Sequence, residues 1–136
     1  MQVKKAGIKI HIAVDILDFP YAMAITTANV TDRDGAVLMF GGMVYQLPRL
    51  QTVLCDGGYT GDNFSNVIFD LLFANVQVAK RPDLHKFTII PQRWIVERTF
   101  GWLDKCRRLW KNCERLLSSS LAMIKLAFIS ILLKRL

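Results

Sequence analysis

The feature that most constrains the fold is an alternation of apolar and other residues close to the N-terminus. Every second position carries a branched apolar side chain: Ile8, Ile10, Ile12, Val14 and Ile16. Lys9, His11 and Asp15 stand at positions between them. Successive side chains of a β-strand point to opposite faces, so this pattern predicts a strand with one covered face.

The residues that follow predict a partner for this strand. Asp18, Phe19 and Pro20 are typical of a turn and interrupt the alternation. A second β-rich segment then covers residues 21–30. Two such segments joined by a short turn favour antiparallel pairing. We therefore predict an antiparallel hairpin over residues 7–30.

Helical and strand patterns alternate in the middle of the chain. The segment 31–34, Thr-Asp-Arg-Asp, offers an N-cap for a helix over 35–46, which ends before Pro48. Residues 52–55 are mainly apolar without alternation, as is typical of a strand buried on both faces. A helix over 62–75 and a strand over 76–79 complete this region.

Two helices are predicted after Pro91. Residues 92–113 contain good helix formers and a single glycine, which indicates one long helix. At 3.6 residues per turn, one face of that helix carries or borders several charged side chains: Arg93, Glu97, Asp104, Lys105 and Arg108. The second helix covers 118–136. Three serines and Lys125 interrupt its apolar residues, so we interpret it as a core helix that packs on the sheet and not as a membrane span.

The order ββαβαβαα combines an antiparallel hairpin with later parallel strands and predicts an α/β fold with a mixed sheet. The 136 residues, 52% of them hydrophobic, suit one domain with a real core. Eighteen Lys and Arg against eleven Asp and Glu give a net charge of +7, which favours a polyanionic partner, nucleic acid before an anionic membrane surface. Three cysteines without paired spacing argue against a disulfide or zinc framework and for a reducing compartment.

Two carboxylates are candidates for chemistry. Asp56 follows a predicted buried strand and precedes two glycines, at the end of the sheet where α/β proteins place ligands. The alternative is a turn residue that caps its own backbone. Glu97 stands among cations on the long helix, where the alternative is an ordinary ion pair with Arg93 at i,i+4. His11 and His85 have no partners at ligand spacing, so surface or strand-pairing roles are expected, and Trp94, Phe100 and Trp102 are expected in the core.

Several motifs together resemble the catalytic domain of bacterial insertion-sequence transposases of the DDE class. They are RWIVERTFGWL (93–103) with RRLWKNCERLL (107–117), preceded in the family's order by IAVD (12–15), DGGYTG (56–61) and VAKRP (78–82). The resemblance covers residues 7–136 and implies a ribonuclease H-like mixed sheet with flanking helices. It matches Asp56 and Glu97 to the second and third catalytic acids. Lys105 is one residue from the commonest family position, and Ile90 replaces a common aromatic residue.

The chemistry implied by the resemblance is metal-dependent cleavage and joining of DNA strands. Two Mg²⁺ ions, or Mn²⁺, would be held by carboxylates that include Asp56 and Glu97, since Mg²⁺ prefers oxygen ligands. Arg93, Arg98, Lys105 and Arg108 would hold the DNA backbone. The expected partners are transposon ends and target DNA, together with further copies of the chain or a full-length transposase. The expected location is the bacterial cytoplasm at the nucleoid, with no membrane partner.

The first acid of the family's triad has no counterpart in these residues, because the matching strand would precede Met1. Asp15 matches a position on the second strand and is not expected to be a metal ligand. We therefore expect the sheet to lack its first, central strand and the chain to be an inactive fragment or the downstream frame of a split transposase. The alternative is a non-enzymatic DNA-binding or interaction fragment that modulates a full-length transposase.

Overall fold

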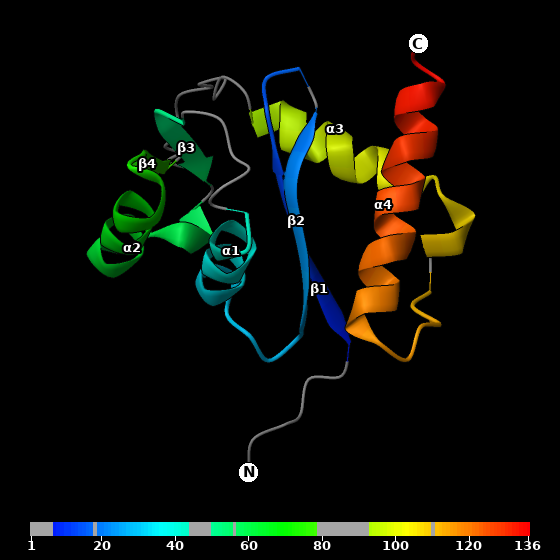
Figure 1. Ribbon diagram of the computed structural model, residues 1–136, viewed down its shortest axis with the longest axis horizontal. Coiled ribbons are helices and arrows are strands. Elements are labelled where there is room, and N and C mark those ends of the chain that lie inside the picture. Colours follow the sequence, from blue (N-terminus) through cyan, green and yellow to red (C-terminus); the bar gives the residue numbers. More distant parts are fainter. Residues whose placement is uncertain (1–6, 18, 44–49, 56, 79–92, 110) are drawn as a thin grey trace, which may run out of the picture.

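The computed structural model describes residues 7–17, 19–43, 50–55, 57–78, 93–109 and 111–136 (Figure 1). A β-hairpin stands in the middle of the molecule. Helix α1 and a small unit made of β3, α2 and β4 lie on one side of it, α4 lies on the other, and α3 runs past one end of the hairpin toward α4. The predicted mixture of helices and strands, in the predicted order, is confirmed.

The hairpin consists of β1 (Ile8–Val14) and β2 (Pro20–Thr27), which pair antiparallel from Ile8 opposite Thr27 to Ala13 opposite Ala22. The carboxylate of Asp15 accepts hydrogen bonds from the backbone N–H groups of Leu17, at 2.8 Å, and Phe19, at 2.9 Å. These bonds close the turn, so the predicted hairpin is confirmed. Asp18 lies outside the described residues.

Helices cover both faces of the hairpin, so the prediction of one covered face was wrong. On one face, α1 (Asp32–Gly41) packs Ala36, Met39 and Phe40 near Ala22 of β2. On the other face, α4 (Leu117–Leu133) packs Ile124 and Phe128 near the isoleucines of β1. Alanines at 13, 22 and 24 make the first face shallow enough for a helix to approach. The expected packing of α4 on the sheet is confirmed.

Strands β3 (Thr52–Cys55) and β4 (Asn75–Val78) are parallel neighbours connected through α2 (Asp62–Leu72). A short 3₁₀ turn, η1 (Gly57–Tyr59), stands between β3 and α2. The predicted helix over 62–75 ends earlier because Phe73 takes a left-handed conformation with φ of 54°, and its N–H bonds to the carbonyl of Phe69.

Helix α3 (Arg93–Asp104) is much shorter than the helix predicted over 92–113. The N–H of Lys105 bonds to the carbonyl of Trp102, and that of Cys106 to the carbonyl of Leu103, at 3.3 and 2.9 Å. Such i to i−3 bonds tighten a last turn and end a helix. A separate 3₁₀ turn, η2 (Arg107–Leu109), follows, while Gln92 and Trp110 lie outside the described residues.

The strands of the described residues form two separate two-stranded sheets, β1–β2 and β3–β4, where one mixed sheet was predicted. The mixture of helices and strands confirms the α/β class, whereas a single sheet is not observed among the described residues. Within the same residues, no helix has both the length and the apolar character needed to cross a bilayer.

Candidate functional site: a cavity between the two sheets

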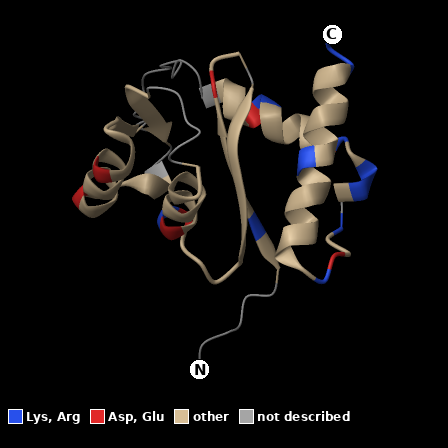
Figure 2. Cartoon of the chain, in the orientation of Figure 1, with Lys and Arg blue, Asp and Glu red and all other residues tan. Residues whose placement is uncertain are grey.

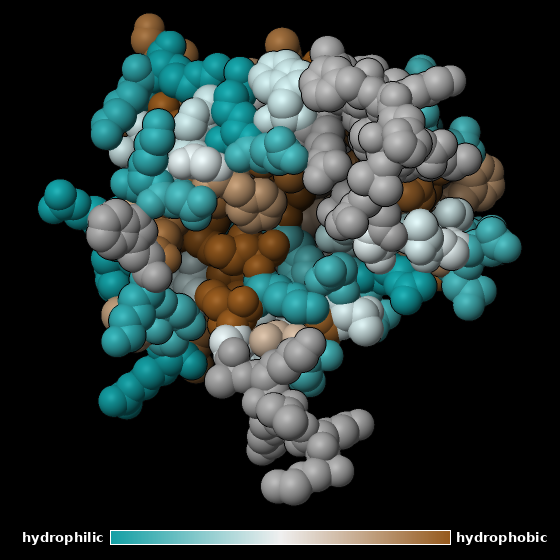
Figure 3. Space-filling view, turned by 180° about the vertical axis from the view of Figure 1, so that it is seen from behind, coloured by the Kyte–Doolittle hydropathy of each residue, from teal (hydrophilic) through white to brown (hydrophobic). Residues whose placement is uncertain are grey.

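A cavity of about 860 Å³ lies between the hairpin and β3. Residues 10–16 of the hairpin and 52–55 of β3 line it, and α1 and α3 contribute further side chains. Apolar atoms reach the surface near the middle of the rear face of the molecule, where the hairpin lies (Figure 3).

Glu97 lies on the wall of this cavity. Helix α3 presents Ile95, Val96, Glu97, Phe100, Gly101 and Asp104 to it, and all of these except Ile95 follow the periodicity expected for one helix face. The predicted grouping of Glu97 with Asp104 on one face is confirmed. Glu97 is exposed to solvent, and Asp15 lies on the hairpin wall of the same cavity.

The C-terminal end of β3 reaches the same cavity. Cys55, the last residue of that strand, lines it. Asp56 follows directly in sequence and lies outside the described residues. The structure therefore brings Glu97 and the strand that leads to Asp56 to one cavity, although the two elements are far apart along the chain.

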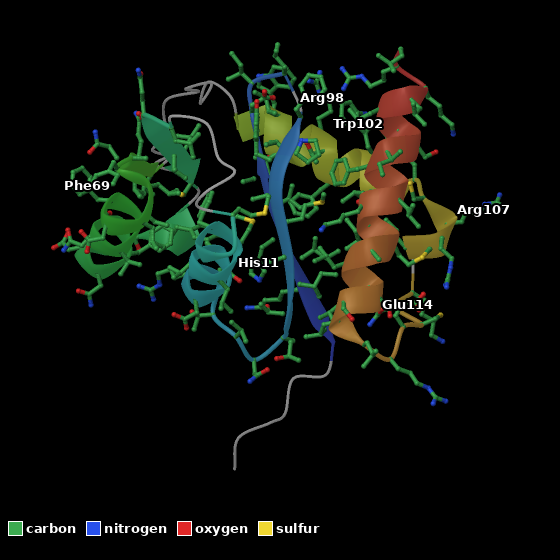
Figure 4. All side chains as sticks on the ribbon, in the orientation of Figure 1. His11, Phe69, Arg98, Trp102, Arg107 and Glu114 are labelled. Carbon is green, nitrogen blue, oxygen red and sulfur yellow. The ribbon has the colours of Figure 1, made fainter. Side chains whose placement is uncertain are left out.

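The four cations predicted to hold DNA have different surroundings. Arg98 is half-buried, with its guanidinium 4.4 Å from the ring centroid of Trp94 and 5.2 Å from that of Trp102 (Figure 4). Arg108 Nη2 lies 2.6 Å from Glu114 Oε1. Lys105 is exposed and directly follows the last residue of α3. Arg93 is the first residue of α3, and its side chain is not among the described parts of the structure.

Arg98, Lys105 and Arg108 do not line the cavity with Glu97. Among its described lining residues there is neither Lys nor Arg, whereas Asp15, Glu97 and Asp104 supply three carboxylates. Basic residues gather instead around η2 and at the C-terminus, with Lys125 on α4, while acidic residues mark α1 and α2 (Figure 2). The basic set that follows α3 was visible in the sequence as Arg107, Arg108, Lys111 and Arg115.

The aromatic residues of α3 only partly fit the expectation that they belong to the core. Trp94 is 51% exposed, which contradicts the prediction for that residue. Trp102 is half-buried and also lies under the guanidinium of Arg135, 4.6 Å from its ring centroid. Phe100 packs against the cluster of Leu103, Ile124 and Phe128. The rings of the two tryptophans are thus covered by stacked guanidinium groups and not enclosed in the hydrophobic core.

His11, for which the sequence predicts a surface or a strand-pairing role, is buried. Its side chain also lines the cavity, and its Nε2 lies 2.9 Å from Thr26 Oγ1 on the neighbouring strand. Burial lowers the pKa of His11 from 6.5, although Asp32 raises it in part and Lys9 lowers it further. The contact of His11 with Thr26 on the paired strand agrees with the strand-pairing role, one of the two roles expected. The other expectation, a surface position, was wrong because His11 is buried.

The described residues do not by themselves form a metal centre. Among them, no group of three or more His, Cys, Asp or Glu side chains is arranged to hold a metal ion. Of the two predicted ligands, only Glu97 belongs to the described part of the chain.

Comparison with known proteins places the chain in a family. Residues 2–133 match the family described as the transposase DDE domain. The chain is also 33% identical over 118 residues to a protein named as a transposase for insertion sequence element IS402 of Burkholderia cepacia, covering 82% of this chain and 56% of that protein. The chain therefore belongs to the DDE-class transposases of insertion sequences, and it spans little more than half the length of this relative. No solved structure gave a significant match.

Proposed function

We propose that the chain is part of the catalytic domain of a transposase and acts in DNA transposition, with Asp56 and Glu97 as two of its catalytic acids. The observation that supports this most is the approach of Glu97 on α3 to the cavity that the end of β3 also lines. An acid on a helix, with a second acid directly after a strand that lines the same cavity, would suit a reaction at phosphorus, where charge must be held in a fixed geometry.

Mg²⁺ or Mn²⁺ is the proposed cofactor, with two ions in the complete family site. Asp56 and Glu97 would be ligands from this chain, because carboxylate oxygens suit these hard cations. Bound ions would activate an attacking oxygen and stabilise the leaving one. The chain's own contribution is to hold the Glu97 carboxylate on a helix beside the cavity.

DNA is the proposed partner, as transposon ends and target, which would place the protein at the bacterial nucleoid in the cytoplasm. The net charge of +7 and the basic side of the molecule near α4 and η2 support DNA binding (Figure 2). Arg93, Arg98, Lys105 and Arg108 are the proposed contacts to the backbone. Arg108 would contact DNA while already paired with Glu114, which reduces its expected contribution.

We further propose that the two sheets are parts of one ribonuclease H-like sheet whose central strand is not among these 136 residues. That strand would carry the first acid. The 136-residue polypeptide alone would then bind metal weakly and fail to cleave DNA. Association with another copy of the chain or with a full-length transposase would be needed for activity.

Titration calorimetry with Mg²⁺ and Mn²⁺ tests the assignment of the acids. We expect Asp56→Asn and Glu97→Gln to abolish the heat of binding seen for the wild type. Asp104→Asn is the matched control, because Asp104 lines the same cavity two turns further along α3 and is not a proposed ligand. Equal losses in all three variants, or no loss in any, would contradict the assignment.

A nicking assay on supercoiled plasmid tests the proposed inactivity. We expect no metal-dependent cleavage by the isolated 136-residue polypeptide. Robust cleavage that Glu97→Gln abolishes would overturn the inactivity while supporting Glu97 as a catalytic acid.

A second candidate function is a non-enzymatic fragment that binds DNA and modulates a full-length transposase. The separation of the basic side of the molecule from the carboxylate-lined cavity favours it. DNA binding that needs no metal, falls steeply with salt and inhibits a full-length transposase would support this alternative, provided that Asp56→Asn and Glu97→Gln leave it unchanged.

A further inference from the structure

Helices with exposed apolar side chains stand at the two ends of the molecule. Helix α2 lies at one end of the longest axis, and α4 with η2 lies at the other (Figure 1). On α2, Phe69 is 50% exposed, and Phe73 at its C-cap is 79% exposed. On α4, Leu126, Ile129 and Leu133 are each more than half exposed. Single exposed apolar residues are ordinary, whereas groups of them mark contact surfaces.

The exposed side of α2 combines aromatic rings with acidic groups. The rings of Phe69 and Phe73 meet edge to face, with their centroids 6.2 Å apart. Two exposed aspartates stand on the same helix, and residues 57–78 contain neither Lys nor Arg. At 3.6 residues per turn, these side chains share the side of α2 opposite its buried Phe64 and Ile68. We call this surface the α2 face, and its residues are Asp62, Asn66, Phe69, Asp70 and Phe73.

The exposed side of α4 combines aliphatic side chains with positive charge. Leu126, Ile129 and Leu133 are three and four residues apart, so they form one row along the helix. Lys125 is exposed beside this row. Over residues 105–136, Lys and Arg outnumber Asp and Glu by eight to one. We call this surface the α4 face, and its residues are Ala122, Lys125, Leu126, Ile129 and Leu133.

The two faces are complementary in charge and alike in their apolar centres. Acidic groups border the rings of the α2 face, and basic groups surround the aliphatic row of the α4 face (Figure 2). An apolar centre with a polar border is the composition of a protein interface, and opposite charges favour the encounter of two surfaces. Two α4 faces would bring like charges together, and so would two α2 faces. The charges therefore favour contact between unlike faces of two copies.

We propose that the α4 face of one copy of the chain binds the α2 face of a second copy. Because the faces lie at opposite ends of the molecule, each copy in a pair keeps one face free for a further copy. Copies therefore join head to tail, and the assembly grows beyond a dimer unless its rotation closes a ring. None of the residues of the two faces lines the cavity beside Glu97, so the contact is independent of the proposed metal site.

Sedimentation velocity of the wild type over a wide range of protein concentrations measures this association. We expect the mean mass to rise past that of a dimer as the concentration increases. High salt should weaken the association in part, because it screens the charges at the borders of the faces and leaves the apolar contact in place.

Two variants each disable one face. Phe73→Asn removes an exposed ring, and asparagine tolerates the left-handed φ of 54° at this position. Leu126→Glu places a charge in the aliphatic row and keeps a good helix former. Each variant alone should associate at least roughly tenfold more weakly than the wild type.

Leu17→Glu is the matched control for Leu126→Glu. Leu17 is 64% exposed, close to the 58% of Leu126, but it lies in the turn of the hairpin and belongs to neither face. This variant should associate like the wild type. Circular dichroism checks that all three variants remain folded.

Mixing the two disabled variants distinguishes unlike faces from like ones. The Phe73→Asn copy keeps its α4 face, and the Leu126→Glu copy keeps its α2 face. An equimolar mixture, with a dye on the N-terminus of one variant, should therefore form a dimer of one copy of each. That dimer should not grow, because both of its free ends carry a disabled face.

An exchange of charge tests whether the borders select the partner. Asp70→Lys and Lys125→Asp should each weaken association by roughly two- to fivefold, as expected for exposed charges. The double variant carries both changes in one chain, so the opposite charges of the two faces are restored. It should regain most of the association of the wild type.

Four results would overturn the proposal. A wild type that stays monomeric at every concentration would mean that no second copy binds these faces. Loss of association in Leu126→Glu but not in Phe73→Asn would mean that two α4 faces meet, and the reverse would mean that two α2 faces meet. Absence of the mixed dimer would exclude contact between unlike faces. Failure of the double charge variant to recover would mean that charge does not select the partner.

Discussion

The imidazole of His11 lies between the hairpin and α1. Gly35 of α1 faces the ring, and a Cβ built at Gly35 would overlap the imidazole atoms. The ring is 5% exposed and bonds to Thr26 Oγ1 at 2.9 Å. Glycine at 35 is therefore required by the close packing of a helix on a strand side chain, and not by its backbone conformation.

Replacing Gly35 by alanine should destabilise the protein. Alanine favours a helix by about 1 kcal/mol over glycine, but overpacking a core costs about 1–3 kcal/mol, and here the new atom would overlap a buried ring. We expect a net loss of up to about 2 kcal/mol in the free energy of unfolding measured with urea. Gly101→Ala, where the added Cβ meets no atom within 4 Å, should instead be neutral or stabilising. Equal effects at both positions would contradict this account of Gly35.

His11 should also make stability depend on pH. Burial lowers the pKa of His11 in the folded state below the value of 6.5 that it has when unfolded, so the unfolded chain binds the proton more readily. The contribution of neutral His11 is therefore fully present above pH 6.5 and is lost as the pH falls through the lower, folded-state pKa. Urea unfolding between pH 7.5 and 5 should show falling stability, and His11→Asn should reduce that slope. An unchanged slope would exclude His11 as its origin.

At the scale of elements, α1 begins with a side-chain cap, which α2 and α4 lack. Thr31 is its N-cap: its side-chain oxygen accepts from the N–H of Asp34 at 3.1 Å, and its hydroxyl donates to the Asp34 carboxylate at 2.7 Å. Asp32 and Asp34 in the first turn favour the positive end of the helix dipole. This reciprocal cap was predictable from the residues of 31–34 because capping is a local interaction.

Thr31→Ala should cost about 1 kcal/mol of stability, because it removes the cap acceptor and leaves an N–H of the first turn without this partner. Thr31→Ser keeps the oxygen and should retain most of the stability. The midpoint of urea unfolding for the two variants checks the expectation. A loss in the serine variant as large as in the alanine variant would indicate that the methyl group, and not the cap, matters.

The early end of α3 shows where local propensity fails. Residues 105–113 contain good helix formers, yet the chain leaves the helix at Asp104. The segment that follows turns back toward α4, and Leu109 then packs with Leu103, Ile124 and Phe128. A continued helix would carry its later residues away from this cluster. Tertiary packing therefore overrides propensity at a position that no local pattern marks.

At the scale of the whole molecule, the sequence predicts where helices and strands lie better than it predicts which of them lie side by side. Alternation and apolar runs located β1, β2, β3 and β4, since these patterns report burial along one segment. Whether β1 and β3 share a ladder depends on what lies between them, which the pattern within each strand does not encode. The sequence pattern also did not predict that helices cover both faces of the hairpin. The two helices, α1 and α4, come from distant parts of the chain.

The candidate site was predictable in part. The motif around Glu97 located a carboxylate, and helical periodicity correctly grouped it with Asp104 on one face. The stacking of Arg98 between Trp94 and Trp102 was not predicted, although their i,i+4 spacing makes such a stack possible on a helix. A spacing shared by many helices becomes informative only when side-chain orientation is known.

The packing of α4 on the hairpin has a consequence for synthesis of the protein. The isoleucines of β1 leave the ribosome well before Ile124 and Phe128, the residues of α4 that cover them. Until α4 has been synthesised, the face of the hairpin that packs against α4 is therefore exposed to solvent. That face is where a chaperone would bind the nascent chain, and a ribosome stalled before α4 would leave it open to aggregation.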